Sequence, residues 1–391
     1  MRRTEMLQEV RRMRFEEAYD VWTERRLTQE EASRMLGVCD RTFRRYIHRY
    51  EERGFDGLLD KRLTQASSRR APVDEVMAIA RQYEGRYGGW GVKHFHAWYR
   101  RDGGQRSYTR VKNTLQSRGL VSKTARKGTH RKRRDPSPLP GMMLHQDGST
   151  HEWVPGKKWD LIVTMDDATG EHYRLFFVQE EGRFSGFQGV RDVILQKGLF
   201  SSLYTDRGSH YWYTPEAGGR VSKGQLTQFG RAMKHRGIEM IAAYPPQARG
   251  RSERAFSTHQ GRLPKELSLQ KITTMDAANR YLAEVYRPAC NAEFMQPPAE
   301  EGSAFVPWIG AHLDDILCEQ YDRTVTADNC VSFEGITLQI PADRYRCHYV
   351  RVRVRVHRYI NGSLAVFHGP RKLADYDAQG KLKDLKKGKA A

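Results

Sequence analysis

The spacing of apolar residues predicts that the first third of the chain is helical. Four apolar residues between positions 40 and 50 recur with the period of a helix and form one face of it: Phe43, Tyr46, Ile47 and Tyr50. Before them, Thr28 and Glu31 predict a capping box at the start of a shorter helix. Gly37 predicts the turn between the two helices, and Asp40 predicts the N-cap of the second. Residues 1–62 are therefore predicted to form a helix-turn-helix module.

A second helical region follows at residues 72–121. Apolar spacing predicts one helix from residue 73 to about residue 83, and two more at Val92–Arg100 and Ser107–Arg118. Glycine-rich turns at residues 88–91 and 103–104 separate these helices. This pattern is similar to a second helix-turn-helix, so the first third of the chain is predicted to hold two modules of the same kind.

From about residue 141 the pattern becomes α/β. The predicted strands are Met142–Asp147, Trp159–Met165, His172–Val178, Leu199–Thr205 and Ile238–Ala242. The predicted helices are Phe184–Lys197, Leu226–Arg236 and Ser252–Leu263. Three consecutive strands followed by alternating helices and strands predict a mixed five-stranded sheet covered by helices, at residues 141–300.

The last part of the chain is rich in predicted strands. After a connector at residues 301–320, the predicted strands are Val325–Val331, Ile336–Ile340, Tyr349–His357 and Leu364–His368. Valine and arginine alternate strictly from residue 350 to 356, which indicates a half-buried strand. The arginine face is interpreted equally well as a strip that faces DNA or as a solvated edge. Residues 321–376 are predicted to form a small SH3-like β-barrel, followed by a disordered basic tail at 377–391.

The positive charge of the chain is concentrated in its first third. Of a formal net charge of +20, residues 1–134 contribute +16, from 33 Lys or Arg against 17 Asp or Glu. Residues 135–300 contribute +1 and residues 301–391 contribute +3. This distribution predicts that the N-terminal part binds a polyanion. A basic run at residues 123–134, within a Pro-containing linker at 122–140, is expected to lie along DNA phosphates.

The second helix of the first module carries basic residues and no acidic ones between positions 41 and 50. A basic amphipathic helix after a tight turn is typical of a helix-turn-helix that reads the major groove of double-stranded DNA. The alternative is a small bundle with a solvated arginine face. The candidate DNA-binding residues are Arg41, Arg44, Arg45, His48 and Arg49 in this helix, Arg106, Arg110 and Lys112 in the second module, and Arg131, Lys132, Arg133 and Arg134 in the linker.

Cysteine usage and hydropathy bear on the compartment. The five cysteines form no C-x-x-C pair, which favours reduced thiols over disulfides or a zinc site. The sequence has no apolar run long enough to span a membrane and no hydrophobic signal sequence at its N-terminus. We therefore expect a cytoplasmic protein, associated with the nucleoid and without a membrane partner.

Three carboxylates stand at positions that suit a metal site. Asp147 and Asp206 end strand-like runs, and Glu253 stands just after a glycine at the start of a predicted helix. Carboxylates on rigid elements are ligands that Mg²⁺ prefers, and paired Mg²⁺ ions support phosphodiester cleavage. The alternatives are strand-end capping for the aspartates and a favourable helix-dipole position for the glutamate. Asp166 and Asp167 form another acidic pair, but their position at a predicted hairpin turn favours local hydrogen bonds.

The residues around the three carboxylates form motifs in a fixed order. They are Leu144-His-Gln-Asp147, Tyr204-Thr-Asp-Arg-Gly-Ser-His210 and Tyr244-Pro-Pro-Gln-Ala-Arg-Gly-Arg-Ser-Glu-Arg254. Together they resemble the motifs of integrase-like DDE transposases, a group that includes retroviral integrases and bacterial insertion-sequence transposases. The overall arrangement is most similar to the ISNCY type. The resemblance implies a ribonuclease-H-like catalytic core at residues 141–300, with the two aspartates and the glutamate as catalytic metal ligands.

The resemblance also implies an activity. A DNA transposase of this family binds the terminal inverted repeats of its element, cleaves the 3′ ends and joins each 3′-hydroxyl to target DNA. It uses Mg²⁺ or Mn²⁺, with two ions expected per active site, and assembles on its DNA as a homo-oligomer, a dimer or larger. The alternatives are a sequence-specific DNA-binding regulator with an inactive integrase-like core, and a general nuclease.

The chain departs from its retroviral relatives near the third motif. Asp206 and Glu253 are separated by 46 residues, a longer spacing, and the excess fits a loop at residues 211–224 that we interpret as a flap near DNA. The zinc-binding His/Cys module of those relatives is absent. Ser257 and Gln260 occupy positions where lysines of the family often touch DNA. The candidate phosphate contacts near the third motif are therefore Arg249, Arg251 and Arg254.

Overall fold

The computed structural model describes residues 3–59, 71–123, 134–216, 219–222, 224–244, 250–310 and 312–383. The chain divides into two compact units, Met1–Arg86 and Tyr87–Ala391. This division falls inside the second predicted helical module, between its first and second helices. The predicted domain boundaries stay predictions. No helix in the described ranges is long and apolar enough to cross a membrane.

The N-terminal unit is helical, as the apolar spacing predicts. Its helices are α1 (Arg3–Thr23), α2 (Gln29–Leu36), α3 (Asp40–Arg53), α4 (Phe55–Leu58) and α5 (Val73–Arg86). Phe15 of α1 packs against Phe43 of α3, with ring centroids 5.9 Å apart, and Ile47 joins the same core. Because the apolar side of α3 is buried in this way, its basic side faces solvent.

The turn between α2 and α3 forms as predicted except at the N-cap of α3. Thr28 caps α2 in a capping box, and Gly37 ends α2 in a left-handed conformation with φ of 71°. The prediction of Asp40 as the N-cap of α3 is wrong, because Cys39 takes that position. Asp40 instead begins the helix and accepts a hydrogen bond from Ser33 Oγ at 2.5 Å, which ties α2 to α3.

The second unit is centred on a mixed five-stranded sheet in the order β3-β2-β1-β4-β5, which confirms the predicted sheet. Its strands are β1 (Met143–Val154), β2 (Lys157–Asp166), β3 (His172–Val178), β4 (Ser202–Thr205) and β5 (Glu239–Ala242). The pairs β1–β2 and β2–β3 are antiparallel, whereas β1–β4 and β4–β5 are parallel. β1 continues past its predicted end because its polar residues 148–152 remain paired with β2.

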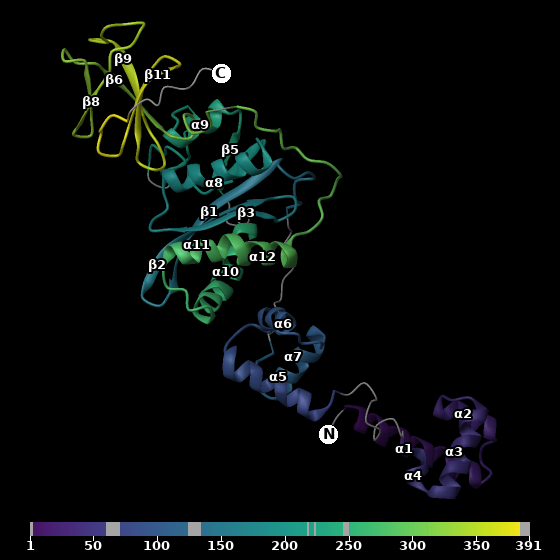
Figure 1. The fold of residues 1–391 in the computed structure, drawn as a ribbon. Coiled ribbons are helices and arrows are strands. Elements are labelled where there is room, and N and C mark those ends of the chain that lie inside the picture. Colours follow the sequence, from purple (N-terminus) through teal and green to yellow (C-terminus); the bar gives the residue numbers. More distant parts are fainter. Residues whose placement is uncertain are drawn as a thin grey trace. The chain divides into compact units, whose positions relative to one another are not determined.

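Helices cover both faces of this sheet (Figure 1). One face carries α8 (Arg183–Lys197) and α9 (Gln228–His235), and the other carries α10 (Gly250–Leu269), α11 (Met275–Tyr281) and α12 (Arg287–Phe294). Each face has its own hydrophobic core. Leu144 and Phe187 belong to the core under α8, and Val163 and Phe256 belong to the core under α10. The sheet is thus the middle layer of three.

Two further helices, α6 (Val92–Arg101) and α7 (Tyr108–Ser117), precede the sheet and match the predicted helices of the second module. α6 is attached to the helices that cover the sheet through a buried pair, because His94 Nε2 lies 2.7 Å from Glu266 Oε1 of α10. Lys265 Nζ of the same helix donates to the backbone oxygen of Gly89 at 2.9 Å. α10 therefore contacts both the sheet and the helices before it.

The C-terminal strands differ from the prediction of a barrel. They are β6 (Glu319–Thr324), β7 (Cys330–Phe333), β8 (Ile336–Gln339), β9 (Arg353–Arg358), β10 (Leu364–His368) and β11 (Arg371–Tyr376). They form a four-stranded sheet, β11-β10-β9-β6, and a separate β7–β8 pair that share one hydrophobic core. The strands do not close into a barrel, since β7 and β8 pair with each other and with no strand of the larger sheet.

The predicted alternation of valine and arginine is confirmed in β9. Val354 and Val356 are buried, whereas Arg353 and Arg355 are exposed. Both arginines lie near Asp322 of the neighbouring strand β6, at 3.8 Å and 3.1 Å. The arginine strip is therefore partly neutralised within the sheet itself.

Candidate active site where β1 and β4 stop pairing

The two candidate aspartates lie where two neighbouring parallel strands stop pairing with each other. β1 and β4 pair in parallel, and the last residues paired between them are Gln146 and Thr205. Asp147 follows Gln146 in the sequence, and Asp206 follows Thr205. Both aspartates are partly exposed. Since β1 and β4 run in parallel register up to this point, the two aspartates lie at the same level of the sheet. Asp206 comes just after β4, whereas Asp147 lies inside β1 and pairs with Val163 of β2.

The same two aspartates share one face of the sheet. His145 and Tyr204 are register partners, each two residues before an aspartate, and their ring centroids lie 5.0 Å apart. Side chains alternate between faces along a strand, so residues two apart point the same way. Asp147 and Asp206 are therefore expected on the same face of the sheet as these two rings.

Backbone N–H groups hold each aspartate. The backbone nitrogen of Gly148 donates to Asp147 Oδ1 at 3.1 Å, and that of Gly208 donates to Asp206 Oδ1 at 2.9 Å. A hydrogen bond to a carboxylate fixes its orientation and is stronger than a bond between neutral groups. The two carboxylates are thus oriented by the chain that immediately follows them.

Helix α10 runs along β1 in the same direction. Near its start, Arg251 Nη1 lies 2.7 Å from Asp167 Oδ1, and the same oxygen lies 2.8 Å from His145 Nε2 on β1. Further along, Gln260 Nε2 donates to Ser149 Oγ of β1 at 2.9 Å. Residue numbers therefore rise in the same direction along both elements, from Arg251 to Gln260 in α10 and from His145 to Ser149 in β1.

This alignment places Glu253 near the level of Asp147. Glu253 and Gln260 are two turns apart and lie on the same flank of α10, while Asp147 and Ser149 lie on the same face of β1. Measured back from the Gln260–Ser149 bond, the glutamate is about 10 Å along the helix and the aspartate about 7 Å along the strand. Glu253 is exposed, and the residues before α10 from 245 to 249 lie outside the described ranges.

The carboxylates have not converged on one point. In the described part of the chain, no three His, Cys, Asp or Glu side chains lie close enough to hold one metal ion. The donor chemistry nevertheless suits a hard cation, because Asp147, Asp206 and Glu253 present only carboxylate oxygens, from two neighbouring strand segments and a helix start. These are the residues that would hold Mg²⁺ or Mn²⁺.

The competing acidic pair has other roles. Asp166 Oδ1 accepts hydrogen bonds from the backbone nitrogens of Ala168 and Thr169 at 2.9 and 3.0 Å, which are the local bonds expected at a hairpin turn. Asp167 is fully buried. Burial raises the pKa of Asp167, but hydrogen bonds from His145 and Ser137 and the charge of Arg251 outweigh burial and hold that pKa below its ordinary value.

The candidate DNA-binding residues fall into three groups. The exposed ones are Arg41, Arg44, Arg45, His48 and Arg49 on α3, and Arg254 on α10. The partly exposed ones are Arg106, Arg110 and Lys112 at or near α7, together with Arg251; Arg134 is half-exposed, and it shares Asp167 as a partner with Arg251. The remaining ones lie outside the described ranges: Arg131, Lys132, Arg133 and Arg249. DNA contact by any of them stays a prediction.

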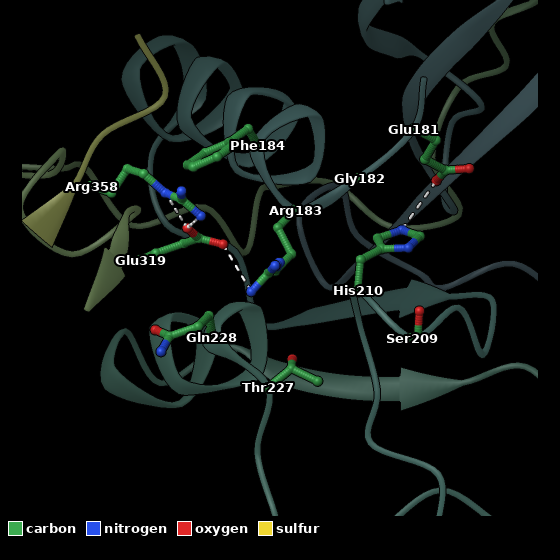
Figure 2. Close-up of a pocket in the computed structure, with 10 residues that line it drawn as sticks. All are labelled: Glu181, Gly182, Arg183, Phe184, Ser209, His210, Thr227, Gln228, Glu319 and Arg358. Atoms are coloured by element: carbon green, nitrogen blue, oxygen red, sulfur yellow. Dashed lines mark hydrogen bonds and ion pairs between the residues drawn. The ribbon is translucent and has the colours of Figure 1, made fainter. Parts of the chain in front are cut away.

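A pocket of about 600 Å³ opens next to the second motif, at the start of α8 (Figure 2). Glu319 of β6 is buried in it between Arg183 of α8 and Arg358 of β9, whose nearest nitrogens form ion pairs with it. On the other side, His210 Nε2 lies 3.4 Å from Glu181 Oε1. Sequence reasoning missed both glutamates because they lie far from every motif along the chain.

The segment after the second motif is anchored in the core under α8. Tyr211, Trp212 and Val221 are buried there, and Tyr211 Oη accepts a hydrogen bond from Gln146 Nε2 at 3.0 Å. Burial, followed by the charge of Glu181, raises the pKa of Tyr211 above its ordinary value. The described residues of the predicted 211–224 loop thus include a buried start and a buried Val221, and its interpretation as a flap stays a prediction.

The sequence of this chain is similar to those of two transposases. Residues 23–74 match the family model described as winged helix-turn helix, which covers α2, α3 and the start of α5. The putative transposase y4bF of Sinorhizobium fredii is 31% identical over 356 residues, which cover 87% of this chain and 75% of that protein. The transposase for insertion sequence IS1202 of Streptococcus pneumoniae is 30% identical over 154 residues, 39% of this chain and 33% of that protein.

Solved structures show a weaker likeness. A chain in the structure of the simian T-cell lymphotropic virus intasome, in complex with a PP2A regulatory subunit, is 15% identical with a TM-score of 0.34. The match covers 78% of this chain and 98% of that chain. The family assignment rests instead on the sequence relatives, one of which is matched over three quarters of its length. This chain therefore belongs to the transposase family of y4bF, the integrase-like transposases that its three motifs indicate.

Proposed function

We propose that this transposase binds the terminal inverted repeats of its element, cleaves the 3′ ends and joins each 3′-hydroxyl to target DNA. Asp147, Asp206 and Glu253 are the proposed catalytic residues. The observation that supports this most is the in-register placement of the two aspartates on the face of the sheet along which α10 runs. The proposed reaction is direct phosphodiester hydrolysis and in-line transfer, without a covalent protein–DNA intermediate.

The proposed metal ligands are those same three carboxylates. When bound, two Mg²⁺ or Mn²⁺ ions would activate the attacking oxygen and stabilise the leaving oxygen of the phosphodiester. Asp147 and Asp206 hold their positions because backbone N–H groups donate to them from the following residues. Glu253 approaches from a helix start, where a negative charge is favoured by the helix dipole.

DNA binding is proposed for the basic surfaces of the chain. The exposed basic side of α3 would read the terminal repeats in the major groove, since its apolar side is buried against α1. Arg254, exposed one residue after Glu253, is a proposed phosphate contact near the scissile bond. A mobile element has two ends to join, so we propose a homo-oligomer, a dimer or larger, as the active form.

The test is cleavage of a duplex that carries the element's own end, in the presence of Mg²⁺. Asp147→Asn, Asp206→Asn and Glu253→Gln are each expected to lower the cleavage rate at least about 100-fold, or roughly 3 kcal/mol of transition-state stabilisation. Binding to the same duplex is expected to remain within about twofold, because the basic surfaces are untouched. Asp276→Asn is the matched control, since Asp276 is an exposed acid in the first turn of α11.

Three outcomes would contradict all or part of the proposal. Binding without any metal-dependent cleavage by the unmodified protein would favour a DNA-binding regulator with an inactive core. Cleavage at the same rate in duplexes with and without the end sequence would favour a general nuclease. Cleavage at the unmodified rate by any of the three carboxylate variants would remove that residue from the active site.

A further inference from the structure

Asp167 joins three separate segments of the chain next to the candidate site. Its carboxylate accepts a hydrogen bond from the backbone nitrogen of Ser137 at 2.8 Å and from Ser137 Oγ at 2.9 Å. His145 Nε2 lies 2.8 Å from it, Arg134 Nη2 lies 2.5 Å from it and Arg251 Nη1 lies 2.7 Å from it. The linker, β1 and α10 are therefore all bonded to one buried side chain.

Arg251 is the member of this network that belongs to α10. Besides the carboxylate, its Nη1 donates to the backbone oxygen of Asp167, and its Nη2 donates to the backbone oxygen of Arg134 at 3.2 Å. Only 26% of the Arg251 side chain is exposed. Both terminal nitrogens of this guanidinium thus have protein acceptors, which is the arrangement of a structural clamp rather than of a group held ready for phosphate.

The clamp fixes the rotation of α10 about its own axis. Arg251 and Gln260 are about 180° apart around the helix and reach acceptors on opposite flanks, one at Asp167 and the other at Ser149. The side chains between them, such as Phe256, are buried under the helix. Because both sides of α10 are held by hydrogen bonds, the helix is fixed in rotation. Glu253 lies on the same side of the helix as Gln260, so the direction of its side chain is fixed as well.

We propose that Asp167 and Arg251 form a positioning pair that orients Glu253 toward Asp147 and Asp206, and that Arg134 and Ser137 couple this pair to the linker from the DNA-binding modules. The inference rests on the proposed function of the three carboxylates. Asp167 and Arg251 touch no reacting atom in this scheme. They act through the first turn of α10.

Loosening the pair has a specific kinetic signature. Without the clamp, the first turn of α10 is held only from its far side, and Glu253 spends less time in the productive position. A misplacement of about 1 Å in a catalytic group lowers the rate on the order of 100-fold. A poorly held ligand also binds its metal less tightly, so that the Mg²⁺ concentration needed for half-maximal cleavage rises.

The experiment measures single-turnover cleavage of the end duplex as a function of Mg²⁺ concentration, alongside duplex affinity and melting temperature. Arg251→Ala is expected to lower the saturating rate by about 10- to 100-fold and to raise the Mg²⁺ midpoint severalfold, with duplex affinity unchanged. Arg251→Lys keeps one donor and is expected to recover part of the rate. Ser137→Ala, which removes one hydroxyl from the linker, is expected to shift the midpoint in the same direction by a smaller amount.

Glu293→Gln is the matched control. Arg262 lies three turns after Arg251 along α10, and its Nη1 is 2.6 Å from Glu293 Oε2. This ion pair is about as sheltered from solvent as the pair of Arg251 and Asp167, and Glu293→Gln weakens it. This variant is expected to lower the melting temperature without moving the Mg²⁺ midpoint. A merely structural role for Arg251 would produce the same result in Arg251→Ala, and that result would overturn the inference.

Three further outcomes separate this inference from the proposed function. If Arg251→Ala weakens duplex binding and its salt dependence while the Mg²⁺ midpoint stays fixed, Arg251 is a phosphate contact and the positioning pair is wrong. If the unmodified protein cleaves and Glu253→Gln does not, but Arg251→Ala equals the unmodified protein, the inference alone fails. If the unmodified protein shows no metal-dependent cleavage, the proposed function fails with it.

Discussion

Gly189 sets how closely α8 approaches the strand that carries Asp147. A Cβ atom at this position would lie 2.8 Å from Thr164 Oγ1 and 3.0 Å from Gln146 Oε1, both of which are buried. Gln146 immediately precedes Asp147 and is held by the backbone oxygen of Gly186 at 3.0 Å. The absence of a side chain at Gly189 therefore lets the helix pack against β1 without moving the candidate site.

Gly189→Ala is accordingly expected to lower the free energy of unfolding by about 1 to 3 kcal/mol, because the added methyl overpacks a buried contact. Gly261→Ala is the control in α10, where nothing lies within 4 Å of the added atom. It is expected to raise the free energy of unfolding by about 0.5 to 1 kcal/mol through helix propensity. Urea unfolding measures both, and equal effects of the two substitutions would contradict the packing argument.

Single residues also mark the limit of what the sequence predicts. Asp147 and Asp206 are recognisable because apolar runs of strand length end at them. The roles of Arg251 and Arg134 cannot be recognised in the same way, because Asp167, the partner that they share, lies 84 and 33 residues away in the chain. The sequence shows that such a residue is positively charged. Which group it pairs with is determined only by the tertiary structure.

At the scale of elements, a buried histidine pair joins α10 to β3. His259 Nε2 of α10 lies 3.2 Å from His172 Nε2 of β3, and His259 Nδ1 lies 2.9 Å from the hydroxyl of Tyr286. Tyr286 ends the π-helical turn Leu282–Tyr286 between α11 and α12. Burial lowers the pKa of His172 to about 4, and burial followed by the charge of His172 lowers the pKa of His259 well below its ordinary value.

This pair predicts a loss of stability in mild acid. Below about pH 6.5 the two histidines take up protons in the unfolded chain but stay neutral in the folded one, so the free energy of unfolding falls as the pH drops toward 4. For His172 alone the loss is about 3 kcal/mol over that range. His172→Gln is expected to flatten the pH dependence of the unfolding free energy between pH 6.5 and 4, and an unchanged slope would exclude this origin.

The elements that sequence patterns identify are those with strong periodicity. β3 and β10 have the bounds predicted for them, because their apolar residues run continuously or alternate cleanly. β6 was missed, since Glu319–Thr324 reads as a polar segment although it pairs with β9 along its whole length. The predicted barrel failed for a related reason: strand patterns indicate which residues are strands, whereas closure depends on which strands pair.

At the scale of the whole molecule, charge and chemistry are separated along the chain. The excess of basic residues lies before residue 135, whereas the three candidate carboxylates lie in the nearly neutral segment that follows. Within the second unit, Glu319 joins the C-terminal sheet to α8 through Arg183, and Arg358 pairs with Glu319 within that sheet, beside the second motif. Most of the candidate DNA-binding residues and the three candidate carboxylates therefore lie in different parts of the chain.

We propose that Asp147, Asp206 and Glu253 act together at one site. Strand transfer of a pre-cleaved end oligonucleotide into target DNA, followed in Mg²⁺ or Mn²⁺, shows whether DNA joining needs all three. We predict a joined product with the unmodified protein and with Asp276→Asn, and none with Asp147→Asn, Asp206→Asn or Glu253→Gln, although each variant still binds the end. Joining at the unmodified rate by any one of the three carboxylate variants would contradict the claim.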